Sequence, residues 1–331
     1  MNPITGAISP QLLVAMREEQ ALRYPWGNDL IAARRPLEDI AAVLDVSRLR
    51  RLAAERQRDG TVAITFVTYN YLAVGLNWVE SLRRLGLSHF VVIAGDPQTA
   101  SAMSDRGIEN VEAATGASSL AVNFKSPAEF SREGLAMATV KFPVVRELLG
   151  QGLNVVFSDA DALWLRDPTP YLQADLAFQR ITHFPRMISR LWGFAACTGF
   201  LYFRSSQPML EFLDACIEEH KRVHDDQVAF NLALLAAGVR WDAGRDADGA
   251  AAPDYAASDA QFEAAFAAIA RQPICGQVTR GDLTVTALPH HLFWRHSWVS
   301  SNQGEMVVCH PNSPKVGAQK MELFKTRGLV F

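Results

Sequence analysis

Two aspartates separated by one residue are the strongest chemical signal in the sequence. Asp159 and Asp161 directly follow the apolar run at residues 153–158. Because side chains alternate along an extended strand, we expect both carboxylates to project to the same side where this run ends. Two like charges that close repel each other unless a cation lies between them, and carboxylate oxygens suit Mg²⁺ or Mn²⁺. The alternative is that Asp159 caps a turn and Asp161 is solvated, but charges next to a buried strand favour the metal site.

A second group of chemically capable residues lies near the C-terminus. The residues Val-Val-Cys at 307–309 are typical of a strand, and they deliver His310 at its end. An imidazole is a good third ligand beside two carboxylates, and it favours Mn²⁺ over Mg²⁺. The alternative is an ordinary loop histidine. The sequence therefore predicts a metal site made of Asp159, Asp161 and His310.

The elements that must position these residues follow from the pattern of apolar runs. From Thr61 onward, short β-branched runs alternate with amphipathic stretches, which is typical of parallel strands joined by helices. Ligands of such sheets bind outside the carboxyl ends of the strands, where the aspartates are expected. The pattern predicts strands at 61–68, 89–95, 153–158 and 198–203, and helices at 77–85, 136–150, 208–221, from about 226, and at 260–271. Residues 242–259 are predicted to be a surface insertion, and residues 1–58 a helical extension that precedes a domain at 59–331.

Composition and charge limit the class of protein. The chain has 331 residues, of which 49% are hydrophobic and 20% charged, as in globular proteins. Its formal net charge of -3 provides no basic field for nucleic acid, so any phosphate binding must be local. The four cysteines are widely spaced without a CxxC pair, which argues against a zinc site or disulfide scaffold and favours a reducing compartment. No signal sequence or membrane span is evident, so we predict a cytoplasmic location.

Five sequence blocks in a fixed order give a family resemblance. They are the lysine-bearing helix at 136–150, VVFSDADALWLRDP at 155–168, CTGFLYFRSS at 197–206, DDQVAFN at 225–231, and a C-terminal His-x-Asn followed by Gly and Lys. Together they resemble the nucleotide-diphospho-sugar transferase family that contains plant rhamnogalacturonan xylosyltransferases and is related to glycogenin-like enzymes. The resemblance covers about residues 61–329. One departure is that the plant relatives carry a membrane anchor and work in the Golgi, whereas this sequence shows no such segment.

The resemblance implies an α/β fold of the GT-A type, with a Rossmann-like, mixed but mainly parallel sheet flanked by helices. It also implies a Mn²⁺-dependent, or else Mg²⁺-dependent, retaining glycosyltransferase. The implied donor is a UDP-sugar of the xylose, galactose, glucose or arabinose type, and the acceptor is unidentified. Because no carboxylate nucleophile other than Asp225 or Asp226 is evident, the leaving phosphate oxygen could itself accept the acceptor's proton in a front-face transfer.

The same resemblance assigns roles to individual residues. It implies that Asp226 and Gln227 are catalytic and that the nucleobase is held by Thr68, Tyr69, Asn70 and Tyr71. It also implies that Lys141 and Asp159 face the donor and that the diphosphate is met by Gly317 with Lys320 or Lys315. The sugar and acceptor side would be lined by Thr198, Gly199, Asp225 and Asn231. Structural alternatives stay open for some of them: Asp226 capping a helix, Tyr71 packing in the core, and Lys141 reaching the surface. The His- and Trp-rich run at 289–298 fits either core or a sugar platform.

Three other functions use similar residues. A sugar nucleotidyltransferase or a phosphohydrolase also pairs carboxylates with Mg²⁺, and a non-catalytic module could bind nucleotide sugars without turnover. A nucleotidyltransferase is expected to carry a Gly-rich basic loop after the first strand, where this chain has Thr-Tyr-Asn-Tyr. The sequence therefore favours the glycosyltransferase.

Overall fold

The computed structural model describes residues 40–113, 132–181, 184–242, 273–296 and 303–331, along with Gln11 and Val14. Most of the N-terminal extension predicted at 1–58 lies outside the described residues. So do the helix predicted at 260–271 and, apart from Asp242, the insertion predicted at 242–259. The boundary predicted at residue 58 stays a prediction.

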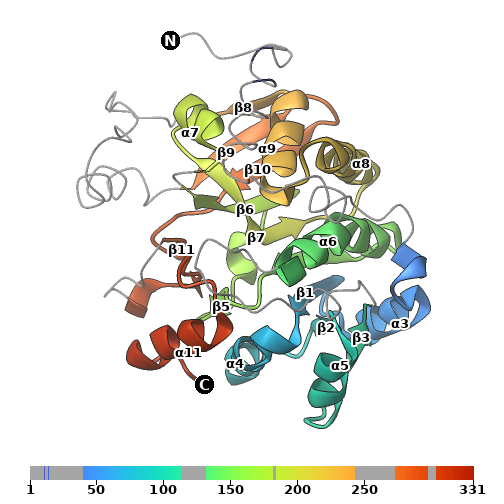
Figure 1. Cartoon of the computed structure of the whole chain (residues 1–331). Helices are drawn as coiled ribbons and strands as arrows, with labels where there is room; N and C mark the ends of the chain where they lie inside the picture. Colours follow the sequence, from blue (N-terminus) through green and yellow to red (C-terminus); the bar gives the residue numbers. More distant parts are fainter. Residues whose placement is uncertain are drawn as a thin grey trace.

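A nine-stranded sheet forms the centre of the molecule (Figure 1). In sheet order its strands are β3 (Asn110–Glu112), β2 (Phe90–Ala94), β1 (Thr61–Val67), β4 (Asn154–Ser158), β7 (Ala195–Phe203), β6 (Leu176–Ile181), β10 (Leu283–Ala287), β9 (Ile274–Val278) and β8 (Val239–Trp241). The pairings make seven of these described strands run one way, while β7 and β9 run the other way. The sheet is therefore mixed but mainly parallel, as predicted.

Alternate residues of the parallel strands pack into two separate cores. In β1, for example, Val62 and Ile64 join one core and Ala63 joins the other. The same division occurs in β4, where Val156 faces away from Val155 and Phe157. Both faces of the sheet are covered, which explains why these strands are apolar along their whole length rather than at every second position.

Helices cover both faces of the sheet, which confirms the predicted α/β class. They are α3 (Val46–Arg56), α4 (Leu72–Arg84), α5 (Pro97–Ser104), α6 (Arg132–Gly150), α7 (Arg186–Trp192), α8 (Gln207–Val223), α9 (Asp226–Ala236) and α11 (Gly317–Thr326). Buried residues of α3, α8 and α9 belong to the first core, together with the C-terminal part of α6, while α4, α5 and α11 contribute to the second. None of the helices among the described residues is long and apolar enough to cross a membrane.

A small second sheet joins the C-terminal segment to the centre of the molecule. It consists of β11 (Phe293–Trp294), β12 (Val308–Cys309) and β5 (Leu163–Trp164). β5 directly follows the two aspartates of interest, and β12 directly precedes His310. The antiparallel pairing of β12 with β5 therefore brings distant parts of the sequence to one place.

Sequence signals located most elements, but not all their limits. The helix predicted from residue 77 begins at Leu72, and the strand predicted from residue 198 begins at Ala195. Several helix starts carry side-chain caps that the sequence makes recognisable: Asp96 and Ser206 accept hydrogen bonds from backbone N–H groups three residues later, with proline in the first turn.

Candidate active site

The two predicted aspartates lie on a turn directly after β4. The N–H of Ala162 donates to the carbonyl of Asp159 at 2.9 Å, which closes a turn over Asp159–Ala162. Both carboxylates therefore face one site, but the reason predicted from the sequence was wrong. The turn brings them together, because the extended backbone of β4 ends at Ser158.

The hydroxyl of Ser158 holds this turn from below. It accepts the indole N–H of Trp78 at 3.0 Å and that of Trp164 at 3.2 Å, and it lies 3.3 Å from the carbonyl of Ala162. A hydroxyl has one proton and two lone pairs, so donation to the carbonyl of Asp159 or Ala162, each 3.3 Å away, and acceptance from the two indoles use its full capacity. Ser158 is fully buried, and the base of the aspartate turn is thereby fixed.

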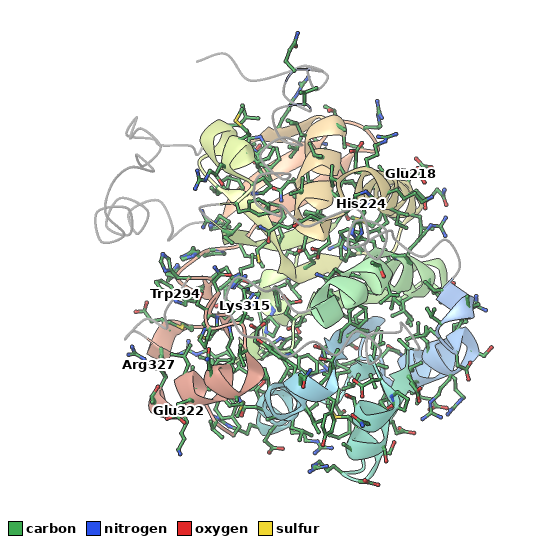
Figure 2. The ribbon with its side chains drawn as sticks, in the orientation of Figure 1. Glu218, His224, Trp294, Lys315, Glu322 and Arg327 are labelled. Carbon is green, nitrogen blue, oxygen red and sulfur yellow. The ribbon has the colours of Figure 1, made fainter. Side chains whose placement is uncertain are left out.

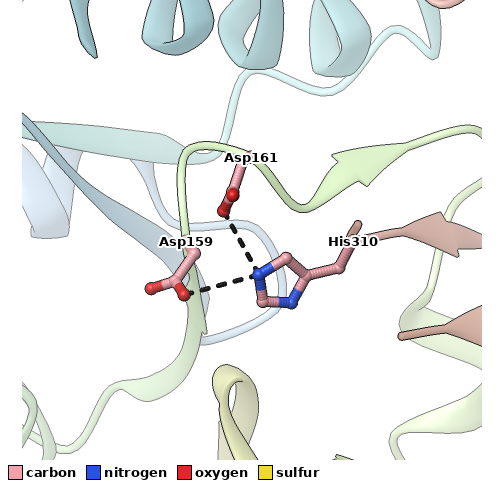
Figure 3. Close-up of side chains that lie close together, drawn as sticks. All are labelled: Asp159, Asp161 and His310. Atoms are coloured by element: carbon pink, nitrogen blue, oxygen red, sulfur yellow. Dashed lines mark ion pairs between the residues drawn. The ribbon is translucent and has the colours of Figure 1, made fainter. Parts of the chain in front are cut away.

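His310 faces both carboxylates from β12 (Figure 3). Its Nε2 atom lies 3.2 Å from Oδ1 of Asp161 and 3.5 Å from Oδ2 of Asp159. The three side chains each offer one ligand atom within 4.8 Å of the others, as a single metal ion requires. The side chain of Asp161 is 10% exposed and that of Asp159 is 37% exposed, so a ligand would reach the group from the side of Asp159.

The charges around this group suit a cation. Burial lowers the pKa of His310 to about 3, so the imidazole is neutral near pH 7. Burial alone would raise the pKa of Asp161, but the charge of Lys320 outweighs this effect, and the pKa lies well below its usual range. A neutral imidazole and an ionised carboxylate are the forms that bind a divalent metal.

The lack of a side chain at Gly199 allows His310 and Asp159 to lie close together. Strand β7 pairs Leu201 with Phe178 and then Cys197 with Gln179, so the residues between them form a bulge toward the site. A Cβ atom at Gly199 would lie 2.1 Å from Cε1 of His310 and 2.5 Å from Oδ2 of Asp159. A bulge beside an active site commonly redirects side chains in this way.

The two predicted diphosphate lysines lie in different surroundings. Lys320 is fully buried, and its Nζ lies 2.9 Å from Oδ2 of Asp161 and also donates to the carbonyl of Pro311. Lys315, which precedes α11 and is labelled in Figure 2, is half-buried. Burial, and next the charges of Arg295 and Lys320, lower the pKa of Lys315 to about 7. Which lysine meets a diphosphate stays a prediction.

Lys141 reaches the site from helix α6. Its Nζ forms an ion pair with Asp226, donates to the carbonyl of Thr198 at 3.2 Å, and lies 3.9 Å from Oδ1 of Asp159. The hydroxyl of Thr198 also donates to Asp226, at 2.9 Å. Burial would lower the pKa of Lys141, but Asp226 and Asp159 outweigh it and the pKa is raised. The alternative of a surface lysine is therefore wrong.

The two aspartates at the start of α9, Asp225 and Asp226, have different roles in the structure. Asp225, not Asp226, caps the helix, because its carboxylate accepts the N–H of Val228 at 2.9 Å. The alternative in which Asp226 caps the helix is therefore wrong, and its carboxylate is turned toward Lys141 instead. Gln227 is half-buried and donates to the carbonyl of Phe184 at 2.8 Å.

Asn231 is placed for a structural task. Its amide accepts the N–H of Ala196 at 2.9 Å and donates to the carbonyl of the same residue at 2.8 Å. The side chain is fully buried and ties α9 to β7. Nothing in this geometry supports the sugar contact predicted for Asn231.

The predicted nucleobase loop lies against the start of α11. Residues Tyr69–Tyr71 form the short helix η2, and a Cβ at Gly317 would lie 2.3 Å from the carbonyl oxygen of Asn70. The Tyr71 hydroxyl donates to Oδ2 of Asp161 at 3.4 Å, while its ring packs against the second core. Tyr69 is 53% exposed, and its N–H donates to Asp96 at 2.9 Å. Thr68 is buried just before η2.

Two residues of the site were missed in the sequence. Gln179 accepts a hydrogen bond from Nδ1 of His310 at 2.9 Å. Arg295 is buried and donates to the carbonyl of His310 at 3.3 Å and to Oδ1 of Asn312 at 3.0 Å. Gln179 stands in strand β6, which the sequence analysis did not predict. Two polar residues, Gln179 and Arg180, interrupt the apolar run Leu-Ala-Phe-Gln-Arg-Ile, and this was the signal that could have identified Gln179.

Comparison with known proteins gives this site a family context. A family model described as nucleotide-diphospho-sugar transferase matches residues 85–324. The chain is 29% identical over 123 residues to an arabinosyltransferase of Arabidopsis thaliana, covering 37% of this chain and 18% of that protein. It is 29% identical over 165 residues to a UDP-D-xylose:L-fucose alpha-1,3-D-xylosyltransferase of the same plant, covering 49% of this chain and 45% of that protein. The chain thus spans less than half the length of these relatives.

Solved structures were compared as well. A bifunctional glycosyltransferase aligns over 53% of this chain and 38% of its own, at 14% identity and a TM-score of 0.38. A galactosyltransferase in complex with donor and acceptor sugar analogs aligns over 52% of this chain and 70% of its own, at 15% identity and a TM-score of 0.35.

Proposed function

This chain belongs to the nucleotide-diphospho-sugar transferase family and is a glycosyltransferase, and we propose that it transfers the sugar of a UDP-sugar donor in a metal-dependent, retaining reaction. One observation carries the proposal: Asp159, Asp161 and His310 each offer a ligand atom within 4.8 Å of the others. They do so at the carboxyl end of β4, where α/β sheets bind their ligands.

The donor set fits a divalent metal. The Nε2 atom of His310 lies 3.2 Å from one carboxylate oxygen and 3.5 Å from another, so one divalent ion bound among these atoms could contact all three side chains. Two oxygen ligands with one imidazole favour Mn²⁺, with Mg²⁺ as the alternative. A divalent cation held here would offset negative charge on the diphosphate as it leaves.

A lysine would share this task. Lys320 is fully buried and already bound to Asp161 and to the carbonyl of Pro311, so it acts by holding that carboxylate. Lys315 is more accessible, and its pKa of about 7 would rise beside a diphosphate, which favours the charged form. We therefore assign the diphosphate contact to Lys315 and a supporting role to Lys320.

The residues on the sugar side support retention without an enzyme nucleophile. The carboxylate of Asp226 is engaged by Lys141 and Thr198, which leaves it a positioning group rather than an attacking one. In the proposed transfer, the acceptor oxygen bonds to the anomeric carbon on the face that the diphosphate leaves. The bond from that carbon to the phosphate oxygen breaks with its electron pair, and the phosphate oxygen takes the acceptor's proton. Gln227 would contact the sugar hydroxyls.

The names of the relatives limit the type of donor sugar that is expected. They are called arabinosyl-, xylosyl- and galactosyltransferases, which supports a UDP-pentose or UDP-hexose of the xylose, arabinose, galactose or glucose type. Tyr69 and Tyr71, on either side of Asn70, would hold the uracil. The acceptor is unassigned, and a cytoplasmic location stays a prediction.

A direct test is turnover of a panel of UDP-sugars with Mn²⁺, with EDTA, and with the Asp161→Ala variant. We expect Mn²⁺-stimulated hydrolysis or transfer of one donor, and loss of at least about 100-fold with EDTA or with the variant. Asp105→Ala is the control, because Asp105 is exposed at the end of α5, away from this group. Full activity of Asp161→Ala in EDTA would contradict the metal role, and tight UDP binding without any turnover would instead indicate a non-catalytic binding module.

A further inference from the structure

A buried glutamine lies behind the histidine of the proposed metal site. Gln179 is fully buried in β6, at the position where the pairing with β7 shifts register. Its side chain occupies the space between the imidazole of His310 and the backbone of β11: the Oε1 atom lies 2.9 Å from Nδ1 of His310, and Nε2 lies 2.9 Å from the carbonyl oxygen of Trp294.

The orientation of this amide follows from its second contact. A carbonyl oxygen has no proton to donate, so the amide atom beside the Trp294 carbonyl must be the NH₂ group. The same carbonyl accepts the backbone N–H of His310 at 2.9 Å, which fixes its position. The other amide atom is therefore an acceptor, and it faces Nδ1 of His310.

This orientation decides where the imidazole carries its proton. An acceptor at 2.9 Å requires Nδ1 to carry a proton. The other ring nitrogen, Nε2, faces Asp159 and Asp161 and is the atom that would bind a metal. Without Gln179 the opposite form would be favoured, because an N–H on Nε2 could donate to Oδ1 of Asp161 at 3.2 Å.

We propose that Gln179 is a positioning residue that holds His310 in the Nδ1–H form and so keeps Nε2 available to bind a divalent metal. The inference deepens the proposed function and rests on its metal role. Groups of this kind, which orient a ligating histidine from behind, typically change metal affinity by about 10–100-fold.

The proton's position can be measured in the metal-free protein. In ¹⁵N spectra of the histidine-labelled chain, protonated and bare imidazole nitrogens are well separated. We expect the His310 signal, assigned with His310→Gln, to show a protonated Nδ1. In Gln179→Met, which keeps the side-chain length but removes both amide contacts, we expect Nδ1 to lose its proton and Nε2 to be the protonated nitrogen. A bare Nδ1 in the wild type would overturn the inference.

Metal affinity gives the second readout. We expect Gln179→Met to weaken Mn²⁺ binding, measured from the EPR signal of free Mn²⁺, by about 10–100-fold, and Gln179→Glu, which keeps an acceptor for Nδ1, to recover most of it. Asn110→Leu is the matched control: it removes another buried amide, one that bonds to the carbonyls of Ala100 and Ile108 near the far edge of the sheet. It is expected to lower the melting temperature without changing Mn²⁺ affinity.

The outcomes separate this inference from the function on which it rests. If the folded wild type binds no Mn²⁺, the metal role fails and this inference fails with it. If the wild type binds Mn²⁺ and Gln179→Met binds it equally well within about twofold, the metal role stands and Gln179 serves packing alone.

Discussion

Charged side chains are held in opposite ways at the two ends of the central sheet. At the carboxyl ends of the strands, Lys141 and Lys320 are 7% and 0% exposed and pair with Asp226 and Asp161. At the amino ends, Arg56 pairs with Glu109, and these side chains are 39% and 47% exposed. Burying charges is expensive, whereas exposed pairs contribute about 0–1 kcal/mol each. Buried charges therefore mark the end of the sheet where a ligand is expected to use them.

A groove of about 550 Å³ lies at the opposite end of the sheet, at the amino ends of the strands. It is lined by residues that include Arg56, Arg58, His89 and Glu109. Of these, Arg58 and Glu109 are exposed, Arg56 is half-buried and His89 is buried. Among the described residues, none of those that line this groove belongs to a possible metal-binding group. The volume of a groove alone therefore does not identify a ligand site.

The largest effect on turnover is expected at Gly199, where the backbone of β7 lies against the side chains of His310 and Asp159. Replacing Gly199 with Ala places a Cβ 2.1 Å from His310 and 2.5 Å from Asp159, so these ligands must separate. Because a displacement of about 1 Å in such a site costs about 100-fold, we expect at least that loss in turnover, together with weaker Mn²⁺ binding. Turnover and EPR titration measure both.

Gly150→Ala is the matched control for Gly199→Ala. A Cβ at Gly150, the last residue of α6, meets nothing within 4 Å. Normal turnover in both variants would show that the close approach at Gly199 is unimportant.

Loss of a buried ion pair at the carboxyl ends of the strands should lower the free energy of unfolding much more than loss of an exposed pair at the amino ends. Lys141→Met leaves Asp226 and Asp159 without their cation, and we expect a loss of about 3–5 kcal/mol in the free energy of unfolding. Arg56→Ala at the opposite end should change it by about 0–1 kcal/mol. Urea unfolding of both variants measures these losses of stability. Equal losses would contradict the difference expected between the two ends of the sheet.

A smaller loss is expected for the residue that holds the aspartate turn. Ser158→Ala leaves the indole N–H groups of Trp78 and Trp164 without their acceptor, which should cost about 1–3 kcal/mol of stability. Because the turn then loses its support, we also expect weaker Mn²⁺ binding. A loss of stability with unchanged Mn²⁺ affinity would confine Ser158 to the core.

Local patterns in the sequence were sufficient for the parallel half of this fold. The strands at β1, β2 and β4 are continuous apolar runs with clear ends, and the caps Asp96 and Ser206 mark helix starts by residue type alone. The grouping of Asp159, Asp161 and His310 was also predicted, since these residue types are distinctive at the ends of such runs.

Features that depend on distant pairing could not be predicted from local patterns. The bulge in β7 exists because β6 and β7 pair out of register around Gln179, and no local pattern encodes that register. The partner of Lys141 is 85 residues away in sequence. The choice between Asp225 and Asp226 as the helix cap depends on a difference of one residue, within the usual error of helix boundaries.

The smallest predicted effect concerns a proton at the edge of the site. In the absence of ligand, burial together with Arg295 and Lys320 lowers the pKa of Lys315 to about 7, so a large fraction of this lysine is neutral at pH 7.5. A bound UDP diphosphate would favour the charged form and raise this pKa. Binding of UDP with Mn²⁺ should therefore take up a fraction of one proton at pH 7.5, and the affinity should fall as pH rises from 7 to 9.

Calorimetry in buffers of different ionisation enthalpy measures the uptake. Lys315→Met should abolish it, whereas Lys325→Met, on the exposed side of α11, should not. Equal uptake in the two variants would assign the proton, and with it the diphosphate contact, to another group.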